Sequence, residues 1–228
     1  MTKSSPAIIT FIGPVGVGKS TQIKMLENHF RSRGRKTIDT YIKSAHGTTY
    51  ILSALIEMVS EAHHPGSDAK AVGARRSIRV AFTPLWNVSE TVSIVGKFLF
   101  SVYLPFRLGY NVLIEEGLIM SIENYRLFRP HVLGVGVSEL PFLDTLLRWA
   151  DSRKHLYIIL DAGDEEVAAR RRSRTFRRTE LEDYVGLQRA VMARLRGPNM
   201  LVVETSGKSI GEVHKIIVDH LLKNEYWL

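Results

Sequence analysis

The chain has 228 residues, of which 45% are hydrophobic and 24% are charged, and this balance is ordinary for a globular protein with a large buried core. It contains no cysteine, which excludes disulfide bonds, thiolate catalysis and cysteine-bound zinc. Lysine and arginine outnumber acidic residues by 31 to 23, and the resulting net charge of +8 suits either a polyanion such as nucleic acid or a small phosphate-rich substrate.

The first predicted element is a buried strand over residues 7–12, an apolar run rich in β-branched side chains. The segment that follows, residues 13–21, reads Gly-Pro-Val-Gly-Val-Gly-Lys-Ser-Thr and completes the pattern G-x-x-x-x-G-K-[ST]. A helix is predicted over residues 19–33, where apolar side chains recur at helical spacing. Strand, glycine-rich turn and helix are the context in which this pattern binds nucleotide phosphates.

The chemistry of this segment follows from its backbone. Its three glycines permit dihedral angles that turn successive N–H groups toward one point, and the helix N-terminus adds partial positive charge. Lys19 can then reach the β- and γ-phosphates, and the Ser20 hydroxyl can ligate Mg²⁺. We therefore predict an ATP-binding set made of Gly13, Pro14, Val15, Gly16, Val17, Gly18, Lys19, Ser20 and Thr21. The alternative is an ordinary glycine-rich turn between a strand and a helix.

Four further predicted strands alternate with helical patterns, which is typical of a mostly parallel sheet in an α/β protein. The strands fall at 36–42, 111–114, 155–160 and 200–203. The helical patterns fall at 48–62, 88–107, 117–128, 139–150, 164–173, 180–194 and 209–223. Residues 63–85 are expected to be irregular or a short insertion within one domain over residues 1–228. No membrane partner is expected, because the most apolar region, Val88 to Leu118, is interrupted by charged residues and Pro105.

Ligands bind beyond the carboxyl ends of parallel strands, so polar residues just after positions 12, 42, 114, 160 and 203 are candidates for the site. Glu115 and Glu116 follow the third strand, and Asp161 follows the fourth. A carboxylate there can hold Mg²⁺ or its water shell. We favour Glu116, with Glu115 and Asp161 as rivals. Alternatively, these acids only cap the helices that follow them.

Six of the nine residues from Arg170 to Arg178 are arginines. Guanidinium groups on a closing lid would stabilise the charge of a phosphoryl group during transfer. We therefore predict a lid at about residues 170–180 whose catalytic arginines are Arg170, Arg174 and Arg178. The alternative is a solvated helix whose surface ion pairs, four residues apart, are Glu166–Arg170 and Arg178–Glu182.

Together these segments resemble the thymidylate kinases within the P-loop nucleoside monophosphate kinases, over nearly the whole chain. Residues 18–26 look like the family's GKSTQ-x-x-x-L helix start, and residues 160–180 are similar to its fourth strand and to a lid that ends in R-x-E. Residues 43–48 occupy the place of its REPGGT turn. The spacings of the Asp, Ser and Tyr in its DRY-x-x-S-x-x-x-Y segment are matched by Glu116, Ser121 and Tyr125.

The resemblance implies a P-loop three-layer sandwich with a five-stranded parallel sheet in the order 2-3-1-4-5, often in a homodimer. It implies transfer of the γ-phosphoryl group of ATP, with Mg²⁺, to a nucleoside monophosphate. Its acceptor-binding positions fall on Lys43, Lys97 and Tyr125. Because the reaction needs ATP and residues 1–6 lead straight into the first strand, we expect a cytoplasmic protein without a signal peptide.

The chain departs from the family mainly in the acceptor half. The Arg and Tyr of DRY are Gly117 and Leu118, Val15 replaces a common acid, and the REPGG turn keeps only Lys43 and one glycine. Two alternatives therefore stay open. One is an ATP-binding regulatory or nucleic-acid-associated protein. The other is a nucleoside kinase with a hydroxyl acceptor, for which Glu115 or Glu116 could serve as the base.

Overall fold

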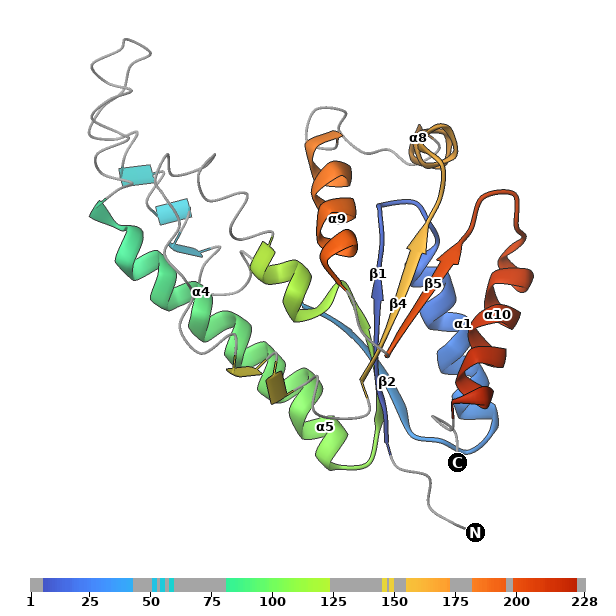
Figure 1. The fold of residues 1–228 in the computed structure, drawn as a ribbon. Helices are drawn as coiled ribbons and strands as arrows, with labels where there is room; N and C mark the ends of the chain where they lie inside the picture. Colours follow the sequence, from blue (N-terminus) through green and yellow to red (C-terminus); the bar gives the residue numbers. More distant parts are fainter. Residues whose placement is uncertain are drawn as a thin grey trace.

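Five strands form one parallel sheet in the order β2-β3-β1-β4-β5, which confirms the predicted fold (Figure 1). The computed structural model describes residues 6–42, 81–123, 155–172, 182–195 and 199–224, with short helical pieces within 51–59 and 145–149. The strands are β1 Ile8–Ile12, β2 Thr37–Tyr41, β3 Asn111–Glu115, β4 His155–Asp161 and β5 Met200–Glu204. The carboxyl ends of all five strands therefore lie at one edge of the sheet.

Helices cover both faces of the sheet and make a three-layer sandwich, with α1 and α10 on one side and α4 and α5 on the other (Figure 1). Residues 117–123, which follow β3, are also helical. The helices with full bounds are α1 Lys19–Ser32, α4 Thr83–Phe98, the π-helix η1 Leu99–Tyr103, α5 Leu104–Arg107, α8 Asp164–Arg172, α9 Glu182–Arg194 and α10 Ile210–Lys223.

The core has two parts because the central strand β1 is buried on both faces. On one face, Ile9 and Phe11 pack with apolar side chains of α1 and α10, among them Leu26 and Ile217. On the other face, Ile8 packs with the buried side of α4. The apolar run of residues 7–12 follows from this double burial. It fixes β1 in the middle of the molecule, together with the glycine-rich segment after it, residues 13–21, which we call the phosphate loop.

The segment predicted as one helix over 88–107 is a longer helix in three pieces. It begins at Thr83, because Pro84 lies in the first turn, where its missing N–H costs nothing. Residues 83–85 are thus helical and not irregular as expected, while 63–80 lie outside the described residues. Pro105 cannot donate to the carbonyl four residues before it, and the chain widens into η1 just ahead, where Leu104 N–H donates to Leu99 O.

The last predicted helix, over 209–223, is α10, and its start is set by local chemistry. Ser209 caps it: its hydroxyl accepts from Glu212 N–H, and the Glu212 carboxylate accepts from Ser209 N–H. Within the part of the chain that the structure describes, no helix is both long and apolar enough to cross a bilayer.

Candidate active site

The phosphate loop leaves the carboxyl end of β1 and returns into α1. Gly13, Gly16 and Gly18 have φ values of 153°, 101° and 99°, a region that side chains rarely allow. At Gly13 a Cβ atom would lie 2.0 Å from the carbonyl oxygen of Leu160, at the end of β4. Glycine is therefore required where the loop crosses from β1 over β4.

Lys19, the first residue of α1, lies across the mouth of this loop and is only 5% exposed. Its ammonium group donates to Gly13 O at 2.6 Å and to Pro14 O at 3.1 Å. The Lys19 ammonium and the N-terminus of α1 therefore meet at the mouth of the loop, which is an arrangement suited to a phosphate chain.

Ser20 lies beside the carboxylate that ends β3. Its hydroxyl donates to Oε2 of Glu115 at 2.9 Å. The sheet register pairs Glu115 with Phe11, and this register brings the end of β3 next to the start of the phosphate loop. A hydroxyl and a carboxylate oxygen are ligand types that Mg²⁺ prefers, with phosphates and water completing its shell. Among the described residues no three acidic or histidine side chains gather as a metal cluster.

Glu116, the favoured metal ligand from sequence, is not the carboxylate that meets Ser20. It is 3% exposed, its backbone N–H donates to Phe11 O at 2.9 Å, and its φ of 72° is left-handed. A left-handed residue with a side chain is uncommon and often marks a functional turn. The structure therefore adds Glu115 as the carboxylate next to Ser20, while the metal role of Glu116 stays a prediction.

Gly117 continues this turn, also with a φ of 72°. A Cβ atom at Gly117 would lie 2.8 Å from Cγ2 of Thr10 on β1, so a side chain does not fit without a shift. This is the position where the resembling family carries an acceptor-contacting arginine. The tight turn between β3 and the helix at 117–123 thus leaves little space for a side chain at this position.

Arg170 lines an open cleft of about 280 Å³ beside the phosphate loop. It forms an ion pair with Glu166, as the solvated-helix alternative expected. Its guanidinium also donates to the hydroxyl of Thr205 at 3.2 Å and to Thr205 O at 3.3 Å. The cleft is further lined by Gly16, Val17, Gly18, Thr21, Gln22, Thr205, Lys208, Ile210 and Val213.

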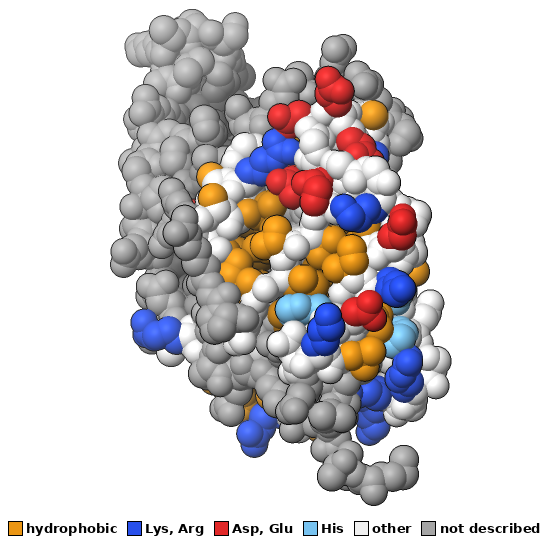
Figure 2. Space-filling model, turned by 45° about the vertical axis from the view of Figure 1, so that its right-hand side comes forward, with side chains coloured by type: hydrophobic (Ala, Val, Ile, Leu, Met, Phe, Trp, Pro, Cys, Tyr) orange, Lys and Arg blue, Asp and Glu red, His pale blue; other side chains and the backbone are white. Residues whose placement is uncertain are grey.

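Asp161, the third candidate carboxylate, is engaged at the junction of β4 and α8. It accepts from Ala162 N–H at 2.9 Å and faces Arg189 of α9 at 3.4 Å. Arg189 also donates to Ala162 O at 2.8 Å and pairs with Asp164, and these carboxylates raise its pKa, chiefly through the hydrogen bond to Asp164. Acidic side chains gather where α8 begins, at the top of Figure 2, and they complement the dipole of that helix.

The acceptor-side predictions are only partly within the described residues. Lys97 is described, and its ammonium lies 3.4 Å from the centroid of the Tyr41 ring at the end of β2. Lys43, Tyr125, Arg174 and Arg178 lie outside the described residues. Ser121 is buried and donates to Ile42 O at 2.7 Å, so it ties the helix at 117–123 to the chain just after β2.

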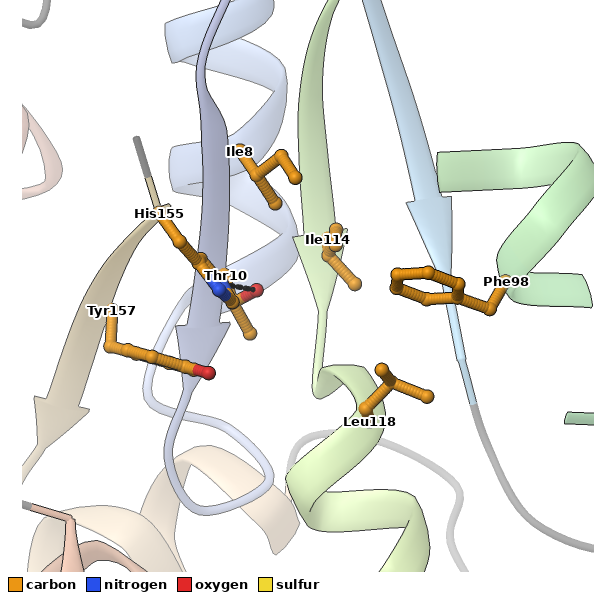
Figure 3. A pocket seen from close by; sticks show the side chains of 7 residues that line it. All are labelled: Ile8, Thr10, Phe98, Ile114, Leu118, His155 and Tyr157. Carbon is orange, nitrogen blue, oxygen red and sulfur yellow. Dashed lines mark hydrogen bonds between the residues drawn. The ribbon is translucent and has the colours of Figure 1, made fainter. Parts of the chain in front are cut away.

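A small enclosed cavity lies between the sheet and α4 (Figure 3). Its volume is about 10 Å³, room for one water molecule and not for a substrate. His155 and the Thr10 hydroxyl share a hydrogen bond of 2.8 Å on its wall. Burial lowers the pKa of His155 to about 3, so the ring stays neutral and belongs to the core.

Comparison with known proteins supports the fold. No protein-family model and no curated sequence matches the chain. Solved structures do match, among them the thymidylate kinase from Candida albicans, with 14% identity, a TM-score of 0.50, and coverage of 97% of this chain and 93% of that chain. That kinase is described as having broad substrate specificity. At this identity the likeness establishes a P-loop kinase-like fold.

Sequence reasoning missed the wall of the cleft formed by Thr205 and Lys208. Both follow β5, and the strand-end rule that selected Glu115 and Asp161 also points there, because the segment after position 203 meets the same sheet edge. The contacts of Arg189 and Gln22 carry no such signal, since their partners lie far away in the chain.

The hydrogen bond between Ser20 and Glu115 predicts that Glu115 is the carboxylate that binds Mg²⁺ or its water shell. In Glu115→Gln we expect the Mg²⁺ concentration needed for half-maximal nucleotide binding to rise on the order of tenfold, because a charged oxygen ligand or water acceptor is lost. A Mg²⁺ titration of nucleotide binding measures this. Glu116→Gln is the matched control and should shift the requirement less; a larger shift in Glu116→Gln would assign the metal to Glu116 instead.

Proposed function

We propose that this protein is an ATP-dependent phosphotransferase of the nucleotide-kinase type that transfers the γ-phosphoryl group to a nucleoside monophosphate. The observation that carries the proposal is the buried Lys19 ammonium at the mouth of the phosphate loop, with the Ser20–Glu115 pair beside it. A thymidylate kinase with the same fold supports it. The net charge of +8 accords with substrates that carry several phosphates.

In this proposal the donor nucleotide lies along the phosphate loop with its base in the cleft beside Arg170. The cleft adjoins residues 16–18 of the loop, and its volume of about 280 Å³ is close to the usual lower limit for a small-molecule site. Arg170 is held in place by Thr205 and Glu166, so it forms a fixed wall on which a base can stack. This role places Arg170 at the base and leaves the transferring phosphoryl group to Arg174 and Arg178.

The chain's own groups then divide the work. Lys19 and the loop N–H groups bind the β- and γ-phosphates, and Ser20 with Glu115 would hold Mg²⁺, which supplies charge neutralisation when bound. The glycine dihedrals fix the N–H groups before the nucleotide arrives, so little reorganisation is needed during transfer. No general base is assigned, because an acceptor phosphate is already a nucleophile.

The proposed role of Lys19 at the phosphates of ATP predicts a large loss of activity when this residue is replaced. In Lys19→Ala we expect ADP release to fall at least about a hundredfold, the scale seen when one charge-stabilising donor is lost. Lys24→Ala is the matched control, since Lys24 is an exposed lysine of the same helix. ADP release under saturating ATP and Mg²⁺ measures both variants. Turnover in Lys19→Ala equal to that of Lys24→Ala contradicts the proposal.

A second candidate acceptor is a hydroxyl group, as in a nucleoside. Two observations favour it: a side chain at position 117, such as an arginine that would bind an acceptor phosphate, would meet Thr10, and the Glu116 carboxylate lies directly beside Gly117 in the chain. A hydroxyl acceptor needs such a carboxylate as base.

A substrate panel separates the two acceptors. With ATP and Mg²⁺, we expect ADP release to be stimulated by one or more nucleoside monophosphates and not by the matching nucleosides. Stimulation by nucleosides alone, abolished in Glu116→Gln, would establish the hydroxyl acceptor. ATP binding without stimulation by either class would instead favour a regulatory protein.

We also propose a homodimer that forms through the outer face of α4. Coiled-coil seam spacing is followed by Leu85, Val88 and Val92 of α4 and by Leu99, the first residue of η1. Val88 and Val92 are 59% and 60% exposed. From Thr83 to Gly96 the charged residue is Glu90, which is buried. Two such seams can therefore meet about a two-fold axis without opposing cations, even in a chain of net charge +8.

The dimer proposal predicts a clear change in mass. We expect the wild-type chain to sediment as a dimer and Val92→Glu as a monomer, because the carboxylate would be buried in the seam. Val202→Glu is the control, since Val202 of β5 is 66% exposed and lies outside the seam. Equal masses for the two variants would argue against α4 as the interface.

A further inference from the structure

Gln22 is a buried polar side chain in the wall of the cleft beside the phosphate loop, which is called the donor cleft from here on. Its amide nitrogen donates to Ile210 O at 2.9 Å, and Ile210, the first residue of α10, lines the same cleft. Its amide oxygen accepts from Nδ1 of His214 at 3.3 Å. One side chain of α1 thus fixes the start of α10 and the position of that wall.

His214 rests in turn on His29 of α1. The two imidazole rings meet edge to face, with centroids 5.8 Å apart and planes inclined by 71°. His29 Nε2 lies against Nη1 of Arg33, and because a guanidinium can only donate, that imidazole nitrogen must be unprotonated. The packing of α1 on α10 is therefore built for two neutral rings.

Protonation would change this contact in three ways. A proton on His29 removes the acceptor that Arg33 uses and places the charged His29 ring against the Arg33 guanidinium. Once His214 is also protonated, a third cation joins these two. Burial lowers the pKa of both rings; Arg33 lowers the pKa of His29 further, and His29 lowers that of His214. Histidine and basic side chains share the face of the molecule shown in Figure 2.

The described carboxylates of the two helices either have other partners or are exposed to solvent. Glu27 of α1 pairs with Arg31, Glu212 of α10 closes the capping box with Ser209, and Asp219 is exposed. Lys24 and Lys215 are exposed cations of the same helices and add positive charge.

We infer that Gln22 is a positioning residue for the donor cleft and that the His29–His214 pair behind it makes nucleotide binding sensitive to acidic pH. The inference rests on the proposed function, since it assumes that the cleft holds the base of a nucleotide. Protonation of the pair separates the start of α10 from α1, shifts Ile210, and widens the cleft that the nucleotide base occupies.

The direction of the pH dependence follows from linkage. Both rings have a lower pKa in the folded chain than the ordinary histidine pKa of 6.5, so the unfolded chain takes up more protons as the pH falls. The free energy of unfolding is therefore unaffected by these rings well above pH 6.5. It falls as the pH drops below 6.5 toward the lowered pKa values, and it levels off beneath them.

The test uses the full chain and variants that keep the hydrogen bonds but not the charge. His29→Gln retains an acceptor near Nε2, and His214→Asn retains a donor near Nδ1. We expect the Kd of wild-type protein for ATP with Mg²⁺ to rise on the order of fivefold from about pH 7.5 to about pH 5.5, and to rise less in the double variant. Protonation of ATP itself is common to all variants, so the difference between them isolates the pair.

His220→Gln is the matched control. His220 also lies on α10 with a pKa lowered by burial and Lys223, and its variant should keep the wild-type pH dependence. A double variant that retains the full pH dependence overturns the inference.

Gln22→Ala should raise KM for ATP with little change in kcat. A fall in kcat as large as the fall in kcat/KM would show that Gln22 acts in the chemical step and not in positioning.

Two further readouts do not depend on nucleotide binding. Imidazole resonances of His29 and His214 should titrate below the range of a free imidazole, and thermal unfolding should lose less stability at acidic pH in the double variant than in the wild type. If ATP does not bind at any pH while these two results appear, the proposed function fails and the histidine contact stands. If the rings titrate normally, the inference fails whatever the nucleotide result.

Discussion

The functional end of the molecule depends on one buried ammonium group. Lys19 is 5% exposed, and removing a charge from water is costly unless other groups compensate. The loop supplies two carbonyl oxygens, and the fold holds them in place by carrying β1 through the centre of the sheet between β3 and β4. The close crossing of Gly13 over the Leu160 carbonyl makes this loop shape dependent on glycine. The loop therefore places an ammonium group beside the N-terminus of α1, and this combination suits an anion such as a phosphate.

Most of the fold and the phosphate loop were predictable because their signals are local. The predicted strands at 7–12, 111–114 and 155–160 coincide with β1, β3 and β4 within one residue at each end. The strand order came from the resemblance and not from the residue pattern. The break of the long helix at η1 was missed, although Pro105 within an otherwise helical run is a recognised cause of such distortions.

The sequence could not show whether Glu115 or Glu116 lies beside Ser20, because this depends on where β3 ends and on how it pairs with β1. Side chains alternate along a strand, so a one-residue change in where β3 ends decides which of two neighbouring glutamates faces Ser20. The predicted strand stopped at residue 114, whereas β3 includes Glu115, paired with Phe11. Arg170 shows the same limit. Its pairing with Glu166 is local and was foreseen, but its contact with Thr205 requires β4 and β5 to be neighbours.

The two halves of the site follow different constraints. In the phosphate loop, backbone carbonyl oxygens accept from Lys19 and Ser20 donates to Glu115, so this half of the candidate site is set largely by the path of the main chain. In the other half, Gly117 after β3 leaves little space for a side chain, and Lys97 of α4 lies against Tyr41 at the end of β2. Because the left-handed turn at Glu116 and Gly117 is backbone geometry, a single substitution cannot restore the family's arginine without moving Thr10 of the central strand. An acceptor bound here would therefore be recognised by groups other than an arginine at position 117, and the fold shared with a thymidylate kinase does not by itself carry that enzyme's specificity.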